Sequence, residues 1–232
     1  HYHVFDLSGS PFNTGRTSYF HNAIGGYHAA KPGRMQDLYD FYISQNNMEV
    51  LNMLNAKYFI VPSEGGQPQA QQNPNAFGNA WFVDNIKWVE SANEEILNLK
   101  EVDLQNTAVI NSEFKSEVSE DFKATGNAEI QLQSYQPNEL VYETNVSSPQ
   151  FVVFSEMYYQ PGWQAYLDGE KVEHVRANYL LRAMNIPAGE HTVTFRFEPE
   201  VVNTGSSIAL ASSIILVLII LGGFYYKSRN RE

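Results

Sequence analysis

The stretch AYLDGEKVEHVRANYLLRAMNIPAGEHTVTFRF, residues 165–197, decides the fold of this chain. Asp168-Gly169 lies between the segments AYL and KVEHV, where such a pair is a hairpin turn signal. Pro187-Ala188-Gly189 marks a second turn, and the segment HTVTFRF after it alternates apolar and polar residues. Short strands separated by turns in this way predict an antiparallel β-sandwich.

The alternation of apolar and polar residues that is typical of strands begins well before this stretch. Ile130 and Leu132, then Leu140 and Tyr142, and then the run FVVF at 151–154 all read as strands. The sandwich is therefore expected at 120–199.

The first half of the chain predicts a small α+β domain at 1–115. Residues 1–34 have no helical period and indicate loops and short extended pieces. Residues 35–55 show apolar residues at helical spacing, which favours two short helices broken around Asn46-Asn47. Short strands are expected at 56–61 and 108–110, a strand or hairpin at 80–89, and a short helix at 94–100.

The C-terminal end carries a transmembrane signal. Residues 208–226 read IALASSIILVLIILGGFYY, and a helix of this length spans roughly 28 Å, close to the thickness of a bilayer core. A transmembrane helix is therefore expected at 206–226 and a basic tail at 227–232. Lys227, Arg229 and Arg231 all follow the helix, so the positive-inside rule places the tail in the cytoplasm and residues 1–205 outside.

The composition excludes several classes of function. The formal net charge is -11, and without the last six residues 12 basic and 25 acidic residues remain. Such a domain lacks the basic footprint that nucleic acid requires, so no nucleic-acid partner is expected. The chain has no Cys, which excludes disulfides, thiolate metal sites and cysteine nucleophiles.

An aromatic cluster in the sandwich is one candidate for carbohydrate contact, since Trp and Tyr rings offer flat apolar faces with polar edges. Its members are Tyr158, Tyr159, Trp163 and Tyr166. The alternative, which the residues favour, is that these rings close one end of the sandwich.

Two arginines, Arg176 and Arg182, follow the cluster. Arg182 is in register with Met184 and Ile186, which indicates a half-buried side chain with a carboxylate partner. An anionic lipid phosphate or a sugar acid is the alternative ligand.

The N-terminal segment adds further candidate glycan contacts, namely Arg16, Tyr19, His21 and His28. A metal site built from His1, His3, His21 and His28 is conceivable, but their spacing matches no known ligand pattern. The sequence therefore predicts no metal and no cofactor. Motifs for a nucleophile elbow, a phosphate-binding loop or a dinucleotide fold are absent from the sequence.

The chain resembles the C-terminal region of the YfhO family of bacterial polytopic membrane proteins. The matching stretches are RTSYFHNAIGGYHAAKPGRMQDLYDF (16–41), VLNMLNAKYFIVP (50–62), NPNAFGNAWFV (73–83) and FSEMYYQPGWQAYLDGEKVEHVRANYLLRAMNIPAGEHTVTFRF (154–197). The resemblance implies a location in the bacterial cytoplasmic membrane and a relation to glycosyltransferases that use polyprenyl-phosphate sugars to modify cell-surface polymers. Catalysis in such enzymes is placed on an early external loop upstream of this region, so no catalytic residue is carried over to this chain.

Two functions follow as hypotheses. In the first, this chain is the non-catalytic extracytoplasmic portion of such a membrane protein, with membrane lipid, a cell-surface glycan and, through upstream helices, a polyprenyl-phosphate sugar as its partners. In the second, it is a single-pass, membrane-anchored carbohydrate-binding or adhesion module without enzymatic activity.

Overall fold

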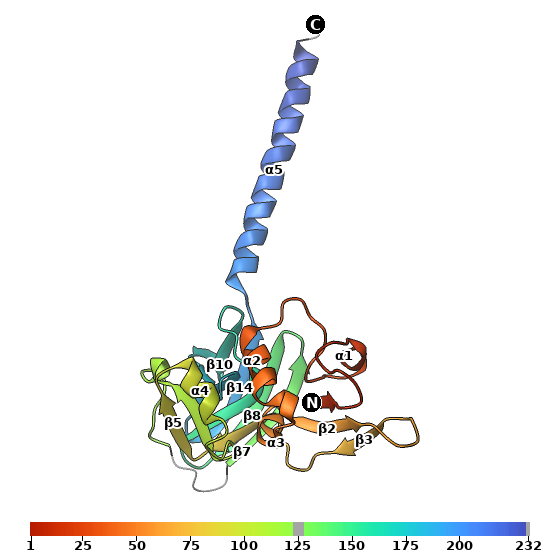
Figure 1. Cartoon of the computed structure of the whole chain (residues 1–232). Coiled ribbons are helices and arrows are strands. Elements are labelled where there is room, and N and C mark those ends of the chain that lie inside the picture. Colours follow the sequence, from red (N-terminus) through yellow and green to blue (C-terminus); the bar gives the residue numbers. More distant parts are fainter. Residues whose placement is uncertain (123–127, 231–232) are drawn as a thin grey trace.

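The computed structural model describes residues 1–122 and 128–230 and confirms the expected fold class. The chain begins with a small mixed arrangement of helices and strands, continues into sheets that form a sandwich-like arrangement, and ends in one long apolar helix. Figure 1 shows this helix projecting from the body, with the C-terminus at its far end. The predicted sandwich span includes 123–127 and the predicted tail includes Arg231; these positions lie outside the described residues.

The N-terminal part is built on a three-stranded sheet with β2 at its centre. Its elements are β1 (His3–Asp6), α1 (Arg16–Phe20), α2 (Gly33–Phe41), η1 (Ile43–Gln45), α3 (Met48–Met53), β2 (Ala56–Val61) and β3 (Gln69–Gln72). β1 pairs with β2 in parallel, and β3 pairs with its other edge antiparallel. Helix α1 lies where loops and extended pieces are predicted, because five residues with mostly exposed side chains give no apolar period.

The break expected at Asn46-Asn47 is confirmed. Asn46 adopts a left-handed conformation with φ of 55°, which ends η1. The side chain of Asn47 then accepts a hydrogen bond from the Val50 amide at the start of α3. The two asparagines therefore stop one helix and cap the next.

The first sheet of the sandwich has five antiparallel strands in the order β11-β10-β14-β8-β7. They are β7 (Ala128–Gln136), β8 (Glu139–Val146), β10 (Trp163–Leu167), β11 (Glu170–Val172) and β14 (Gly189–Phe197). The turn predicted at Asp168-Gly169 connects β10 and β11, with φ of 52° and 89° at its two residues. Both values are the positive φ that a tight hairpin turn requires.

The second sheet has six strands in the order β4-β9-β13-β12-β6-β5. They are β4 (Ala80–Val83), β5 (Asn85–Val89), β6 (Thr107–Asn111), β9 (Gln150–Met157), β12 (Val175–Ala177) and β13 (Leu181–Ile186). Helix α4 (Ala92–Asn98) lies between the parallel strands β5 and β6, and η2 (Ser112–Phe114) follows β6. Strands from both sides of the boundary expected at 115–120 therefore share one sheet. The turn at Pro187-Ala188-Gly189 carries the chain from β13 in this sheet to β14 in the other.

Two hydrophobic clusters fill the body. The smaller one contains Tyr142, Phe154 and Phe195, so it takes residues from β8, β9 and β14 and joins the two sheets. The larger one extends from Phe5 and Leu38 in the N-terminal part to strands of the six-stranded sheet. Burial of these apolar side chains is the main force that holds the N-terminal part against the sandwich.

Helix α5 (Glu200–Arg229) is the one helix in the described part of the chain that is long and apolar enough to cross a membrane. None of its residues is buried against the body. Only Glu198 and Pro199 separate it from β14. The amide of Glu198 donates to the Gly162 carbonyl at 2.6 Å, and its carboxylate accepts from the Tyr166 hydroxyl at 2.6 Å.

Candidate functional site

The structure forms an open pocket where the first residues of the chain meet α1. Its volume is ≈ 370 Å³, and we call it the N-terminal pocket. It is lined by His1, Tyr2, Ser18, Tyr19, Phe20, His21 and Asn22. Tyr19 and Phe20 are 82% and 70% exposed, so two aromatic rings face solvent at its rim. The pocket thus combines apolar ring faces with hydroxyl, imidazole and amide groups.

Backbone and side-chain hydrogen bonds fix α1 beside β1. The Val4 amide donates to the Asn22 carbonyl at 2.8 Å, and the Ile24 amide donates to the Val4 carbonyl at 2.9 Å. The carboxylate of Asp6 accepts from the hydroxyls of Thr17 at 2.6 Å and Ser8 at 2.6 Å. Burial by itself raises the pKa of Asp6, but these hydrogen bonds outweigh it and bring the pKa below its ordinary value. Asp6 is therefore a charged anchor that holds α1 in place.

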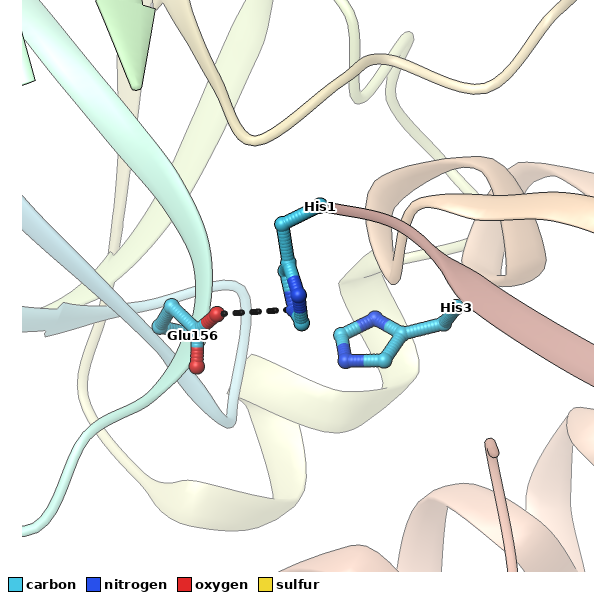
Figure 2. Close-up of side chains that lie close together, drawn as sticks. All are labelled: His1, His3 and Glu156. Carbon is cyan, nitrogen blue, oxygen red and sulfur yellow. Dashed lines mark ion pairs between the residues drawn. The ribbon is translucent and has the colours of Figure 1, made fainter. Parts of the chain in front are cut away.

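His1 also belongs to a group of three side chains that lie close together, as Figure 2 shows. Nε2 of His1 lies 3.7 Å from Oε1 of Glu156, and the His1 and His3 rings are in edge-to-face contact at 5.2 Å. One nitrogen of each histidine and one carboxylate oxygen all lie within 4.8 Å of one another. We call this group the His1–His3–Glu156 cluster. It is the arrangement in the described residues that has the donor set for a metal ion.

Burial shifts the proton equilibria of this cluster. It raises the pKa of Glu156 to about 7, although the positive charge of Arg182 opposes the shift. Burial lowers the pKa of His3, even though the Leu54 carbonyl accepts a hydrogen bond from its ring. His3 is therefore a neutral imidazole at physiological pH, which is the form that ligates metals.

Arg182 lies deeper and is almost completely buried. Its Nε donates to the Met157 carbonyl at 2.9 Å, and its guanidinium lies over the rings of Trp163 and Phe195, 4.2 and 4.9 Å from their centres. Within the described residues no carboxylate oxygen is within 4.0 Å of it. Glu156 acts on it only at longer range. The direct ion pair expected for Arg182 is thus replaced by contacts with aromatic rings.

Arg176 has the carboxylate partners instead. Its Nε lies 3.5 Å from the fully buried carboxylate of Glu95, and its Nη2 donates to Glu113 at 2.7 Å. Nη1 of Arg34 also lies 3.1 Å from Oε2 of Glu95, and the Tyr179 amide donates to Oε1 of Glu95 at 3.2 Å. Burial raises the pKa of Glu95 despite both arginines. This network joins α2, α4 and β12, so carboxylates within the protein balance the charge of Arg176, although its buried Nε makes no hydrogen bond among the described residues.

The predicted aromatic cluster does not form one exposed surface. Trp163 and Tyr158 are half-buried, Trp163 against Phe197 and Arg182, and Tyr158 against Phe114 and His174. Tyr166 is held by Glu198, with Arg196 over its ring. Tyr159 is the one exposed member of the four, at 50% exposure.

The N-terminal candidates divide differently. Tyr19 and His21 line the N-terminal pocket, whereas Arg16 and His28 are exposed and do not line it. Of the four histidines considered for a metal, His1 and His3 come together, and the third donor is Glu156. Sequence reasoning missed Glu156 and its neighbour Tyr135. The only available signal was an acidic residue directly after the apolar run of β9.

The architecture defines a membrane-anchored protein with a β-rich domain beside one apolar helix. A family model described as "Bacterial membrane protein YfhO" matches residues 39–209. The chain belongs to this family, because the match covers well over half of its residues. The N-terminal pocket lies before the matched range, whereas Glu156 lies within it. No curated protein and no solved structure gives a significant match.

Proposed function

We propose that this chain is the non-catalytic extracytoplasmic portion of a polytopic membrane protein that resembles lipid-linked-sugar glycosyltransferases, and that it contacts the glycan acceptor through the N-terminal pocket. The observation that carries the proposal is the pair of exposed rings, Tyr19 and Phe20, at the rim of a pocket in a domain joined to a membrane helix.

The pocket has the chemistry that carbohydrate recognition needs. Sugar rings pack their apolar faces on aromatic side chains, and their hydroxyls exchange hydrogen bonds with planar polar groups. Tyr19 and Phe20 supply the first, and Ser18, His21 and Asn22 supply the second. Its volume of ≈ 370 Å³ falls within the range of small-ligand sites, roughly 300–1,000 Å³.

The orientation of the chain belongs to the same proposal. Lys227 and Arg229 end α5, and no basic residue lies in its first turns, so the positive-inside rule supports a cytoplasmic C-terminus. The domain then faces the compartment in which cell-surface polymers are assembled. A polyprenyl-phosphate sugar would be handled by helices upstream of this chain.

Binding of cell-wall polysaccharide to the full chain in detergent micelles tests the proposal. Tyr19→Ala removes an exposed ring from the pocket and is expected to weaken binding by about fivefold, because a stacked ring contributes on the order of 1 kcal/mol. Tyr27→Ala is the matched control, since Tyr27 is also highly exposed but does not line the pocket. Equal binding by the parent and Tyr19→Ala, or no binding by the folded parent, would remove the pocket from the acceptor site.

Tyr159→Ala tests the second aromatic group in the same assay. Tyr159 is the exposed member of the predicted cluster, so its removal reports on glycan contact without disturbing the core. A loss with Tyr159→Ala and none with Tyr19→Ala would move the contact to the sandwich end.

A further inference from the structure

We propose that His1, His3 and Glu156 form a binding site for a zinc ion. The site goes beyond the glycan contact proposed above and does not depend on it. Two imidazoles and one carboxylate are a recurrent three-ligand set for zinc in proteins.

The fold brings the ligands together from two distant segments. His1 and His3 are two residues apart at the start of β1, and alternate residues of an extended chain lie on the same side. Glu156 projects toward them from β9, near its end. The donor atoms lie within 4.8 Å of one another, and His1 Nε2 and Glu156 Oε1 are 3.7 Å apart. Two donors on one tetrahedral zinc ion are about 3.3 Å apart, so small side-chain movements complete the geometry.

His3 is already arranged as a metal ligand. Its Nδ1 lies 2.8 Å from the Leu54 carbonyl, and since a carbonyl only accepts, Nδ1 carries the proton. Nε2 is then left with its lone pair, on the side of the ring that faces His1 and Glu156 in Figure 2. A backbone carbonyl on the distal nitrogen is the usual way in which proteins orient a zinc-bound histidine.

The His1 ring is held in place, but one of its nitrogens, Nε2, is unsatisfied among the described residues. Its side chain is only 5% exposed, and its ring stacks on Tyr135 of β7 with the centres 3.6 Å apart. In the described part of the chain, its buried Nε2 has no hydrogen-bond partner. Buried polar atoms are nearly always satisfied, so an atom of this kind, aimed at a carboxylate 3.7 Å away, points to a ligand between them. The Asn22 amide lies 3.3 Å from His1 Nδ1 and can orient the ring once its oxygen faces that nitrogen.

Charge balance limits the affinity. Arg182 is a buried cation that acts on Glu156, so it opposes a second cation nearby. Three protein ligands also leave one coordination position for water or another donor. We therefore expect a reversible site rather than one on which the fold depends.

The test is zinc titration of the full chain in detergent micelles, without a histidine tag. Two residues added before His1 keep the α-amino group from chelating metal. The parent is expected to bind one zinc ion, and cobalt in its place should give the visible absorption of a low-symmetry nitrogen and oxygen site. Glu156→Gln and His1→Ala should each weaken binding by more than about tenfold. His28→Ala is the matched control and should bind like the parent, because His28 is exposed and outside the cluster.

Two results would overturn the site. One is a folded parent chain that binds no zinc, and the other is unchanged affinity in both Glu156→Gln and His1→Ala. Far-UV circular dichroism of each variant shows that the fold is intact, and Glu156→Gln is nearly isosteric, so one variant stays informative if another unfolds. Tyr19→Ala should retain zinc, which separates this site from the proposed glycan contact.

Discussion

The guanidinium carbon of Arg182 lies 4.2 Å from the centre of the Trp163 ring. Arg182 is in β13 of the six-stranded sheet and Trp163 is in β10 of the five-stranded sheet, so the contact joins the two layers of the sandwich. Phe197 packs against the same indole in an edge-to-face contact at 5.3 Å. The ring is therefore occupied by its own protein.

Trp163→Ala should lower the free energy of unfolding by about 3–5 kcal/mol, since it removes a large packed ring and uncovers a buried cation. Trp163→Phe should cost much less, because a ring remains over the guanidinium. Denaturant unfolding of the full chain in micelles measures both. Tyr159→Ala, at an exposed position, should stay within about 0.5 kcal/mol of the parent. A Trp163→Ala chain as stable as the parent would contradict the structural role.

Glu95→Gln should destabilise the chain by about 3 kcal/mol. The substitution leaves Arg176 and Arg34 beside a neutral amide in a buried setting, and loss of one member of a buried ion pair is strongly unfavourable. The value is at the low end of the usual range because Arg34 reaches solvent. Glu139→Gln is the control: it breaks the exposed pair with Arg196 and should cost less than about 1 kcal/mol. Equal effects of the two substitutions, again from denaturant unfolding, would contradict the prediction.

His174 makes stability depend on pH. Burial, helped by the nearby charge of Arg182, lowers its pKa from 6.5 to about 4. Below pH 6.5 the unfolded chain binds a proton on this imidazole, whereas the folded chain does not. The free energy of unfolding is therefore unaffected by His174 above pH 6.5 and decreases as the pH falls toward 4. The loss amounts to about 3 kcal/mol at most.

The His174→Gln variant isolates this effect from other titrating groups. Its free energy of unfolding, measured from pH 8 to pH 4, should fall less steeply than that of the parent. Asp168 and His191, an exposed pair, are unchanged in both proteins and cancel in the comparison. Identical slopes in the two proteins would show that His174 is not buried as a neutral ring.

The proposed orientation of α5, with a cytoplasmic C-terminus, predicts a protease pattern. A charged residue costs about 2.5–3.5 kcal/mol at the centre of a membrane helix, so the uncharged segment at 208–226 is the part expected to span the bilayer. Protease added to intact spheroplasts should digest the domain, while a tag placed after Glu232 stays protected until lysis. Digestion of the tag in intact spheroplasts, with the domain spared, would reverse the proposed topology.

Much of the fold follows from local patterns. The β10–β11 turn at Asp168-Gly169, the helix break at Asn46-Asn47 and helix α5 each depend on neighbouring residues, so the sequence predicts them directly. The six-stranded sheet does not follow in this way. It depends on pairing of β6 with β12, at Ile110 and Ala177, and no local period encodes a contact across such a separation.

The candidate site shows the same limit. The exposed ring of Tyr19 belongs to a segment that the sequence marks as aromatic and polar, so it could be predicted. Glu156 could not be paired with His1 and His3, because more than 150 residues separate them and only the folded chain brings them within 4.8 Å. Arg182 was expected to be half-buried with a carboxylate, but aromatic rings replace that partner.

The junction between β14 and α5 limits the distance between the domain and the apolar segment at 208–226. Glu198 is fixed to the sandwich by two hydrogen bonds, and Pro199 restricts the backbone at the only other residue before the helix. Residues 200–207 then add roughly 12 Å of helix before the apolar segment starts. Such a short connection favours a position of the domain close to the end of the apolar segment. We therefore expect the domain to meet molecules that reach the membrane surface, either carried on a lipid or extended down to it.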